Sequence, residues 1–259
     1  GGSIADGLGG ALFEADVAVT GGRITEIGRI TGTGTEEIDA RGKLVTPGFV
    51  DVHTHYDGQV TWSQDITPSS QNGVTTAIMG NCGVGFAPCR PSDHVRLIQL
   101  MEGVEDIPEP VLSAGIPWAW ESFPDYMDWL SQRRFDMDIG AQLPHAALRV
   151  YVMGERGANR DPATAEDNRA MAALAGDAVR AGALGFSTSR TLNHRTSTGD
   201  YTPTLKASED ELTAIAGAMH RTGRSVFQFV LDLSTLDEDL PMMLRVAENT
   251  KIPVSFSIT

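Results

Sequence analysis

Apolar and polar residues alternate along the first part of the chain in short, strand-like segments. Four such segments are found at 15–20, 23–27, 37–40 and 43–45. Gly21-Gly22 and Arg41-Gly42 separate them as turn residues. Residues 1–10 are rich in glycine and are expected to form a loop. We therefore predict a small antiparallel β-layer over residues 1–46, as the N-terminal part of a small β-domain.

After residue 46 the pattern changes to apolar strands that alternate with helices. The predicted strands are one leading into residue 53, then 73–79, one within 139–152, 183–187, 226–231 and 253–258. Alternation of strand and helix predicts a parallel sheet. Because a (β/α)8 barrel has eight strands, six strands indicate either an open sheet or part of a barrel. We predict the α/β class, with a partial TIM-type barrel of about six βα units over residues 47–259.

Helix boundaries are marked by capping residues. Thr164 to Asp167 resembles a capping box, and Ser208 to Glu211 opens a second helix; Gly182 and Gly223 are the expected ends. A third helix is predicted over 240–248. The connection 83–138 is long enough that it must have a fold or function of its own. Within it, the helical spacing of three aromatic residues predicts core packing: Phe123, Tyr126 and Trp129.

Two histidines, His53 and His55, follow directly on the first predicted barrel strand. Its apolar residues, expected to be buried, are Val45, Phe49, Val50 and Val52, with a kink at Pro47-Gly48. Side chains alternate along a strand, so the two imidazoles are expected on one face, where they can chelate one metal ion. The alternative is a hydrogen-bonded pair that closes a core strand. The position at a strand end, where barrel enzymes place their active sites, favours a metal site.

Composition narrows the choice of partners. The 34 acidic and 20 basic residues give a net charge of −14, which argues against nucleic acid and anionic membranes as partners. No apolar segment approaches the roughly 18 residues of a membrane span. No secretory leader is visible, so we expect a cytoplasmic protein in which Cys82 and Cys89 are reduced thiols.

Several motifs together resemble the amidohydrolase superfamily. The segment 47–55 is similar to its first barrel strand. The segments 73–83, 152–154 and 182–188 resemble the D-aminoacylase (N-acyl-D-amino-acid deacylase) branch, and 16–28 resembles its N-terminal β-segment. By themselves, the two histidines indicate only the superfamily. Together with the segment Gly80-Asn-Cys-Gly83 they are fairly specific for the branch.

The resemblance implies a zinc site. In that branch a cysteine after the second strand is a zinc ligand, and Cys82 lies at the matching position; a buried free cysteine is the alternative. Cys89 has no matching role and is expected to be structural. The branch's further zinc histidines follow the fifth and sixth strands, where this chain has Asp232 and Thr259 instead. We therefore expect one Zn²⁺ on His53, His55 and Cys82, with Asp232 a possible oxygen ligand.

A second metal and a catalytic residue are harder to place. A carbamylated lysine, which bridges two metals in many amidohydrolases, has no counterpart, because the only lysines are Lys43, Lys206 and Lys251. The resemblance implies that the acid–base aspartate lies on the eighth strand, beyond Thr259. Asp57 and Glu155 also lie near strand ends, and a solvated or structural role is expected for both.

Three further residues in the βα loops are candidates for contact with substrate. His145 could hydrogen-bond substrate or orient a ligand, or be structural. Arg190 and His194 follow the fourth strand directly. An arginine suits a two-pronged grip on a carboxylate, which an N-acyl amino acid carries, whereas a salt bridge is the alternative for Arg190.

The first functional hypothesis is a metal-dependent hydrolase that cleaves the amide bond of an N-acyl-D-amino acid or a related small molecule. A cyclic amidase acting on hydantoin-like or dihydropyrimidine-like rings is the alternative within enzymes. A non-catalytic homologue or fragment is the alternative outside them. Metal content and hydrolysis of N-acetyl-D-amino acids distinguish the three.

Overall fold

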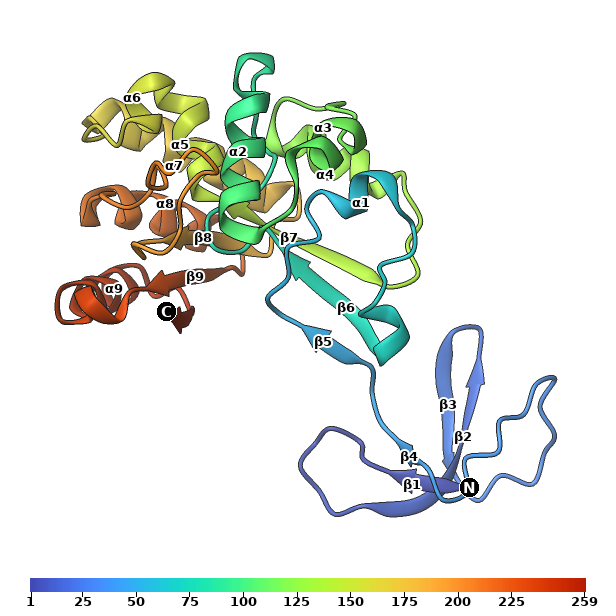
Figure 1. Cartoon of the computed structure of the whole chain (residues 1–259). Coiled ribbons are helices and arrows are strands. Elements are labelled where there is room, and N and C mark those ends of the chain that lie inside the picture. Colours follow the sequence, from blue (N-terminus) through green and yellow to red (C-terminus); the bar gives the residue numbers. More distant parts are fainter. The chain divides into compact units, whose positions relative to one another are not determined.

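A computed structural model describes all of residues 1–259. The chain divides into two compact units, residues 1–49 and 50–259 (Figure 1). The first unit contains a four-stranded β-sheet and the second a six-stranded one. Only Phe49, the first residue of the six-stranded sheet, belongs to the first unit.

The first unit is a sheet with the order β3-β2-β1-β4. Its strands are β1 (Gly2–Ile4), β2 (Phe13–Thr20), β3 (Arg23–Gly28) and β4 (Leu44–Val45). The predicted hairpin is β2 and β3, which pair antiparallel. The predicted antiparallel layer is confirmed by the pairing of β1 with β2 and of β2 with β3, and β1 also pairs parallel with β4.

Two other expectations for this unit are wrong. Residues 2–4 form a strand rather than a loop, because Gly2 lets β1 approach β4: a Cβ there would lie 3.0 Å from Val45 Cγ2. Residues 37–40 are not a strand, because the chain turns at their end, where Lys43 N donates to Ala40 O (2.9 Å).

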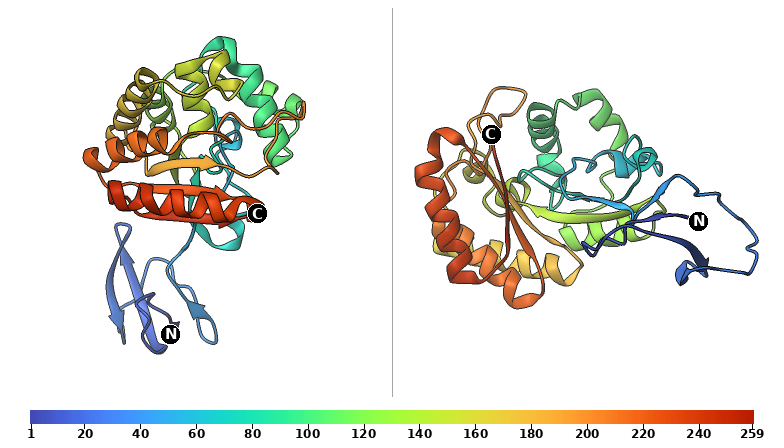
Figure 2. Two further views of the ribbon diagram at one scale, coloured as in Figure 1. Left: turned by 90° about the vertical axis from the view of Figure 1, so that its left-hand side faces the viewer. Right: turned by 90° about the horizontal axis from the view of Figure 1, so that it is seen from below.

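The second unit contains a six-stranded sheet in sequential order. Its strands are β5 (Phe49–Asp51), β6 (Val74–Met79), β7 (Asp138–Pro144), β8 (Gly185–Ser189), β9 (Val226–Leu231) and β10 (Val254–Ile258). Neighbours from β6 to β10 are all parallel. The sheet curls as part of a barrel wall, so the predicted partial TIM-type barrel is confirmed (Figure 2).

Helices alternate with the strands, as predicted, and outnumber the three whose positions the sequence indicated. They are α1 (Gln59–Trp62), α2 (His94–Glu105), α3 (Glu109–Gly115), α4 (Phe123–Ser131), α5 (His145–Met153), α6 (Glu155–Ala158), α7 (Ala165–Arg180), α8 (Glu209–Thr222) and α9 (Leu236–Thr250), with 3-10 turns at Ser70–Asn72, Pro91–Asp93 and Leu233–Thr235. The N-caps of α7 and α8 are Thr164 and Ser208, which confirms both predicted caps. The connection 83–138 holds α2, α3 and α4.

The apolar core of the second unit includes residues of the sheet, of α7, α8 and α9, and of α2, α3 and α4, and α8 packs against both α7 and α9. Phe186 of β8 and Phe227 and Phe229 of β9 are fully buried, with neighbouring ring centroids 5.3 and 5.4 Å apart. Burial of such a side chain contributes about 1.5–3 kcal/mol. Polar residues between them on the strands therefore face the opposite side of the sheet, toward the barrel interior.

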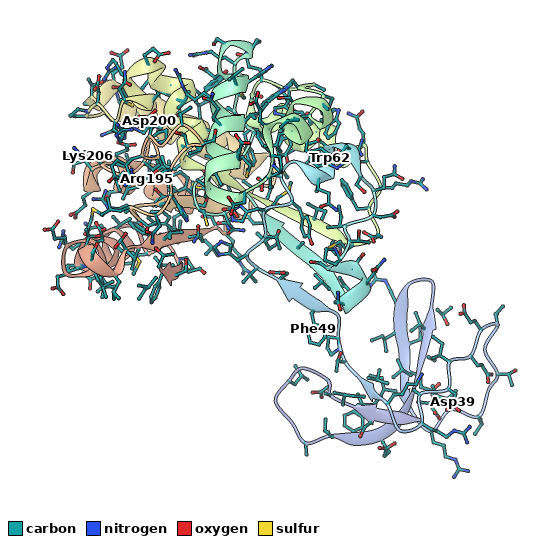
Figure 3. All side chains as sticks on the ribbon, viewed as in Figure 1. Asp39, Phe49, Trp62, Arg195, Asp200 and Lys206 are labelled. Carbon is teal, nitrogen blue, oxygen red and sulfur yellow. The ribbon has the colours of Figure 1, made fainter.

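Strand β5 differs from the prediction. It ends at Asp51, so His53 and His55 lie in the loop that follows it rather than on the strand. Phe49, Val50 and Val52 are 60%, 57% and 63% exposed, although burial was expected (Figure 3 labels Phe49). Within residues 1–259, β5 has a neighbouring strand, β6, on one side only. No helix is both long and apolar enough to cross a membrane.

Candidate metal centre

Three side chains with metal-binding atoms gather beyond the C-terminal ends of β5 and β6. One ligand atom from each of His53, His55 and Cys82 lies within 4.8 Å of the others. The His53 Nε2 atom is 3.1 Å from Cys82 Sγ, and the two imidazole centroids are 5.5 Å apart. The structure therefore brings together the three residues that the sequence nominated as ligands.

The histidine segment is held in place by the residue between the two imidazoles. Thr54 donates to the carbonyl of Ile78 on β6 from both its backbone N and its Oγ1, at 2.9 Å each. The Asn81 amide in turn donates to Thr54 O (3.2 Å). These bonds continue the pairing of β5 with β6 past the end of the strand, which directs His53 and His55 to the end of β6.

The loop that carries Cys82 has a left-handed backbone. Cys82 itself has φ +55°, a conformation unusual for a residue with a side chain, and it lies between Gly80 (φ +76°) and Gly83 (φ +72°). A Cβ on Gly80 would lie 2.3 Å from Gln142 O, so only glycine fits there. The loop thus presents the thiol to His53 at the cost of an uncommon backbone conformation.

The surroundings of the three side chains favour their neutral forms. Burial, and then the neighbouring His53 and His194, lower the pKa of His55 to about 3. Partial burial also lowers the pKa of His53. Burial raises the pKa of the Cys82 thiol, and the carboxylates of Glu105 and Asp57 raise it further. The imidazole lone pairs are thereby available, whereas the thiol must lose a proton on ligation.

Two carboxylates lie beside the cluster. Glu105, at the end of α2, places Oε1 3.2 Å from His55 Nε2, and burial, followed by Asp57, raises its pKa to about 7. Asp57 is buried rather than solvated; its Oδ2 has no hydrogen-bond partner, and burial raises its pKa to about 7. Sequence reasoning missed Glu105, because it lies 50 positions after His55 and belongs to no local motif.

The three proposed substrate contacts have different surroundings. His194 lies beside the cluster: Nδ1 is 2.9 Å from Ser189 Oγ, and burial, then His53, lower its pKa to about 4. Arg190 does not face the cluster's ligands but donates to Asp239 Oδ1 and Ala207 O, both at 2.6 Å. This pairing supports the salt-bridge alternative for Arg190.

His145 is fully buried at the start of α5 rather than in an open loop. Its ring nitrogens lie 2.8 Å from Thr188 Oγ1 and 2.8 Å from Glu211 Oε1. Both nitrogens are thus occupied, which supports the structural alternative. The candidate ligand Asp232 accepts hydrogen bonds from Thr191, Leu192 and Ser234 and serves as a cap, so its oxygens are also occupied.

The remaining nominated residues lie apart from the cluster. Glu155 forms an ion pair with Arg96 (2.6 Å) and is largely exposed, in line with the solvated role expected of it. Cys89 is buried, and its Sγ lies 3.4 Å from Arg90 O, in line with the structural role expected of it.

A cavity of about 450 Å³ opens directly beside the histidines. Its walls include His53, His55 and Glu105, together with the larger side chains Trp62 (labelled in Figure 3) and Ile107. It has room for a small molecule next to the ligand atoms.

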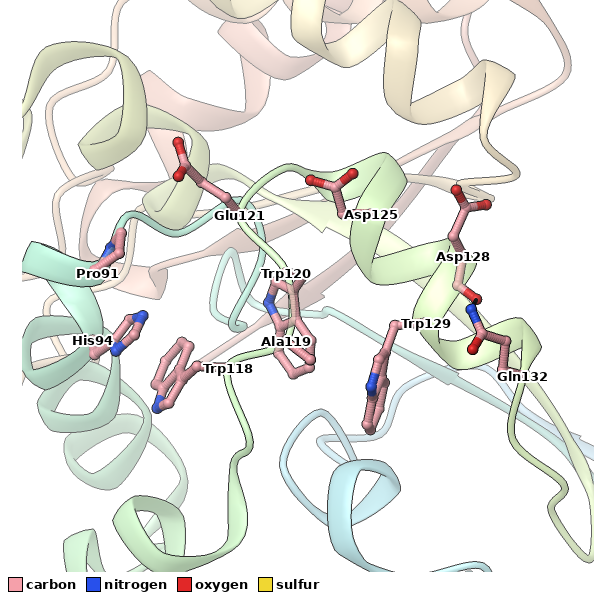
Figure 4. A pocket seen from close by; sticks show the side chains of 10 residues that line it. All are labelled: Pro91, His94, Trp118, Ala119, Trp120, Glu121, Asp125, Asp128, Trp129 and Gln132. Atoms are coloured by element: carbon pink, nitrogen blue, oxygen red, sulfur yellow. Dashed lines mark hydrogen bonds between the residues drawn. The ribbon is translucent and has the colours of Figure 1, made fainter.

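A separate hollow of about 560 Å³ lies in the 83–138 connection, lined by His94, Trp118 and Trp129 among others. His94 and Trp118 stack there at 3.8 Å. Figure 4 shows the carboxylates of Glu121 and Asp125 turned away from the tryptophan rings. Its residues do not include the metal-binding cluster.

Comparison with known proteins gives consistent matches. The model of the amidohydrolase family matches residues 36–259. N-acyl-D-aspartate deacylase and D-aminoacylase of Alcaligenes xylosoxydans xylosoxydans are 32% and 31% identical to the chain over 232 and 224 residues, in each case 86% of this chain and 42% of the relative.

Solved structures agree. A crystal structure of D-aminoacylase superposes with a TM-score of 0.79 at 29% identity, covering 100% of this chain and 51% of that one. N-acyl-D-glutamate deacylase from Bordetella bronchiseptica, complexed with zinc and a phosphonate inhibitor, gives a TM-score of 0.75 at 27% identity, covering 98% and 49%. The chain spans about half the length of the proteins that it matches.

Proposed function

The chain belongs to the amidohydrolase family, and from that premise we propose that this protein is a metal-dependent hydrolase that cleaves the amide bond of N-acyl-D-amino acids or related compounds. The observation that carries the proposal is the cluster of His53, His55 and Cys82 at adjoining strand ends, beside a cavity of about 450 Å³. Similarity to deacylases of N-acyl-D-amino acids supports this class of substrate.

We assign one Zn²⁺ to this cluster. Two features of the residues fit such an ion: a thiol and two imidazoles supply the sulfur and nitrogen donors that zinc prefers, and His55 Nδ1 is buried without a hydrogen-bond partner. The presence of zinc in the Bordetella bronchiseptica structure supports this choice of metal. We propose a single site because the carboxylate of Asp232 is fully engaged with other groups.

When bound, the ion supplies Lewis acidity at the amide carbonyl and makes water more acidic. The residues of the chain bind and orient. Glu105 Oε1 lies 3.2 Å from His55 Nε2, and we propose that this carboxylate orients the His55 ring. His194, which stays neutral at pH 7 because of its lowered pKa, is proposed to hydrogen-bond the substrate from the end of β8.

We assign the catalytic acid–base to none of residues 1–259, since the resemblance places that aspartate on the eighth strand. We further propose that residues 47–259 are the first portion of the hydrolase barrel and residues 1–46 the N-terminal part of a small β-domain. The expected partner is the small-molecule substrate, in the cytoplasm, where Cys82 stays reduced.

The test is hydrolysis by the purified, zinc-loaded full-length protein, including the later strands that the proposal assigns to the catalytic aspartate. We expect release of free amine from N-acetyl-D-amino acids and much slower release from their L-enantiomers, followed with an amine-reactive fluorophore. Opening of a hydantoin or dihydropyrimidine ring, with N-acetyl-D-amino acids left intact, would contradict the proposed substrate class.

Metal content provides a second, independent test. We expect about one equivalent of zinc to remain after gentle purification, given the tight binding typical of such sites. Less than about half an equivalent, together with no hydrolysis, would support a non-catalytic homologue instead.

A further inference from the structure

Gln228 on β9 makes a direct contact with the backbone of Cys82. The Cys82 N–H donates to Gln228 Oε1 at 3.0 Å, across a separation of 146 positions in the chain. Gln228 is 3% exposed and lies on β9 between Phe227 and Phe229, which are in the core. Because side chains alternate along a strand, Gln228 faces the opposite side of the sheet, toward the barrel interior.

The same loop is held by the two strands before β9 as well. Gln142 on β7 donates to Asn81 Oδ1 (2.7 Å), and Ser187 on β8 accepts from Gly83 N (2.9 Å) and donates to Gly80 O. Ser187 and Gln228 are direct partners in the register of β8 and β9. Three consecutive strands thus each provide one side chain to the loop, but only the contact from Gln228 is made to Cys82 itself.

That contact bears on where the thiol points. With φ +55°, Cys82 has a backbone conformation that a residue with a Cβ seldom adopts without support. Loss of the acceptor would leave a buried N–H unpaired in this conformation, and rotation about φ is the way to relieve it. Such a rotation would turn the Cα–Cβ bond and move Sγ from its position 3.1 Å from His53 Nε2.

The amide nitrogen of Gln228 indicates that this side chain does more than fill space. Its Nε2 is buried and has no hydrogen-bond partner. A buried amide donor without an acceptor is unfavourable, so an apolar side chain of similar volume would fill the same space better. The bond to Cys82 is the one favourable polar contact that the side chain makes.

We propose that Gln228 is a positioning residue for the metal site: it holds Cys82 in the left-handed conformation that aims the thiolate at the ion shared with His53. The inference rests on the proposed function, in which Cys82 is a metal ligand. It adds to that site a residue of a strand whose end provides no ligand of its own.

The experiment compares Gln228→Leu with the wild-type chain, using Zn²⁺ and Co²⁺ as probes. We expect the zinc affinity, measured by competition with a chelating dye, to fall about 10- to 100-fold, as is usual when support for a ligand is removed. The thiolate-to-cobalt charge-transfer absorption should weaken, because it reports the sulfur ligand specifically. Gln228→Asn, which keeps the amide but is too short to reach, should give the same results and serves if the leucine variant does not fold.

A double-mutant cycle with Cys82→Ala separates positioning from a general structural effect. In the Cys82→Ala background, Gln228→Leu should change zinc affinity by less than about 3-fold, because the ligand that it positions is gone. An equal loss in both backgrounds, or an unchanged cobalt band in Gln228→Leu and Gln228→Asn, would overturn the inference. Wild-type protein that binds neither ion would instead overturn the proposed function, and the inference with it.

Discussion

Two histidine clusters in the second unit differ in how their side chains are paired. His145 has a hydrogen-bond partner at each ring nitrogen, and its partner Glu211 also accepts two bonds from Arg149 Nη1 (2.9 and 2.8 Å). In the cluster of His53, His55 and Cys82, the His55 Nδ1 atom is buried with no partner at all.

The difference separates a histidine that stabilises the fold from one that is available to a ligand. Burial by itself raises the pKa of Glu211, but the hydrogen bond with His145 and then the positive guanidinium of Arg149 outweigh it and keep that pKa lowered. Burial lowers the pKa of His145 itself, so the ring donates as a neutral group. By contrast, no group in the protein forms a hydrogen bond with His55 Nδ1, and a metal cation could bind to the lone pair of that atom.

The largest effect is expected from Glu211→Ala. Because this change leaves Arg149 as an uncompensated buried charge, the free energy of unfolding should fall by about 3–5 kcal/mol. Urea denaturation followed by circular dichroism measures the loss. Glu155→Ala, which breaks an exposed ion pair with Arg96, should cost less than about 1 kcal/mol. Similar losses in the two variants would remove the distinction between the buried cluster and a surface pair.

His53→Ala is expected to weaken zinc binding strongly while it changes the stability of the fold only slightly. Zinc affinity should fall by at least about 100-fold, since a ligand contributes more than the groups that support it. The stability of the metal-free protein should change by less than about 1 kcal/mol, because the His53 ring is only partly buried and its nearest contacts are the other two proposed ligands. Isothermal titration with Zn²⁺ and urea denaturation of the same sample test both parts, and zinc binding at wild-type strength would refute the ligand assignment.

Glu105→Gln should have a smaller effect on the same site. The carboxylate faces His55 Nε2 at 3.2 Å, and removal of such a partner typically lowers metal affinity by about 10-fold or more. Glu109→Gln, an equal change of charge at the exposed start of α3, is the matched control and should leave zinc binding unaltered. If both variants lower affinity equally, the effect is one of net charge and not of contact with His55.

The smallest effect concerns a pair near the surface. The hydrogen bond from Arg156, together with the cap at Thr164, lowers the pKa of Asp167 to about 2. In the unfolded chain the pKa of an aspartate is about 3.9. The charged Asp167 carboxylate therefore stabilises the fold fully above that pH, and this contribution is lost as the pH falls toward 2. Solvent screens Arg156, and Asp167→Asn should therefore cost only about 1 kcal/mol at pH 7 and clearly less at pH 3. An equal cost at both values, by urea denaturation, would exclude a charge effect.

Local patterns predicted much of the fold. The caps at Thr164 and Ser208 are where the helices begin, because a cap depends on residues within one turn. The strands and their parallel arrangement followed from alternation in the same way. The burial of β5 was predicted wrongly, because whether a strand has a neighbour on both sides depends on the whole sheet.

The site was predictable only in part. His53, His55 and Cys82 were nominated from motifs at strand ends, and the structure brings them together, although their role as ligands stays a prediction. Glu105 and Gln228 were not found, because each contacts the cluster through tertiary packing that no spacing in the sequence encodes. His145 resembled a loop contact because its partner Glu211 lies 66 positions away.

The pairing of β5 with β6 has a consequence for local unfolding, because the segment after β5 carries two of the proposed ligands and the loop after β6 carries the third. His53 and Cys82 are 29 positions apart, and they follow β5 and β6, respectively. The two residues can therefore move apart only if β5 separates from β6. An ion bound by both acts as a clasp, and its binding free energy adds to the cost of that opening. Zinc should therefore slow amide exchange in β5 selectively.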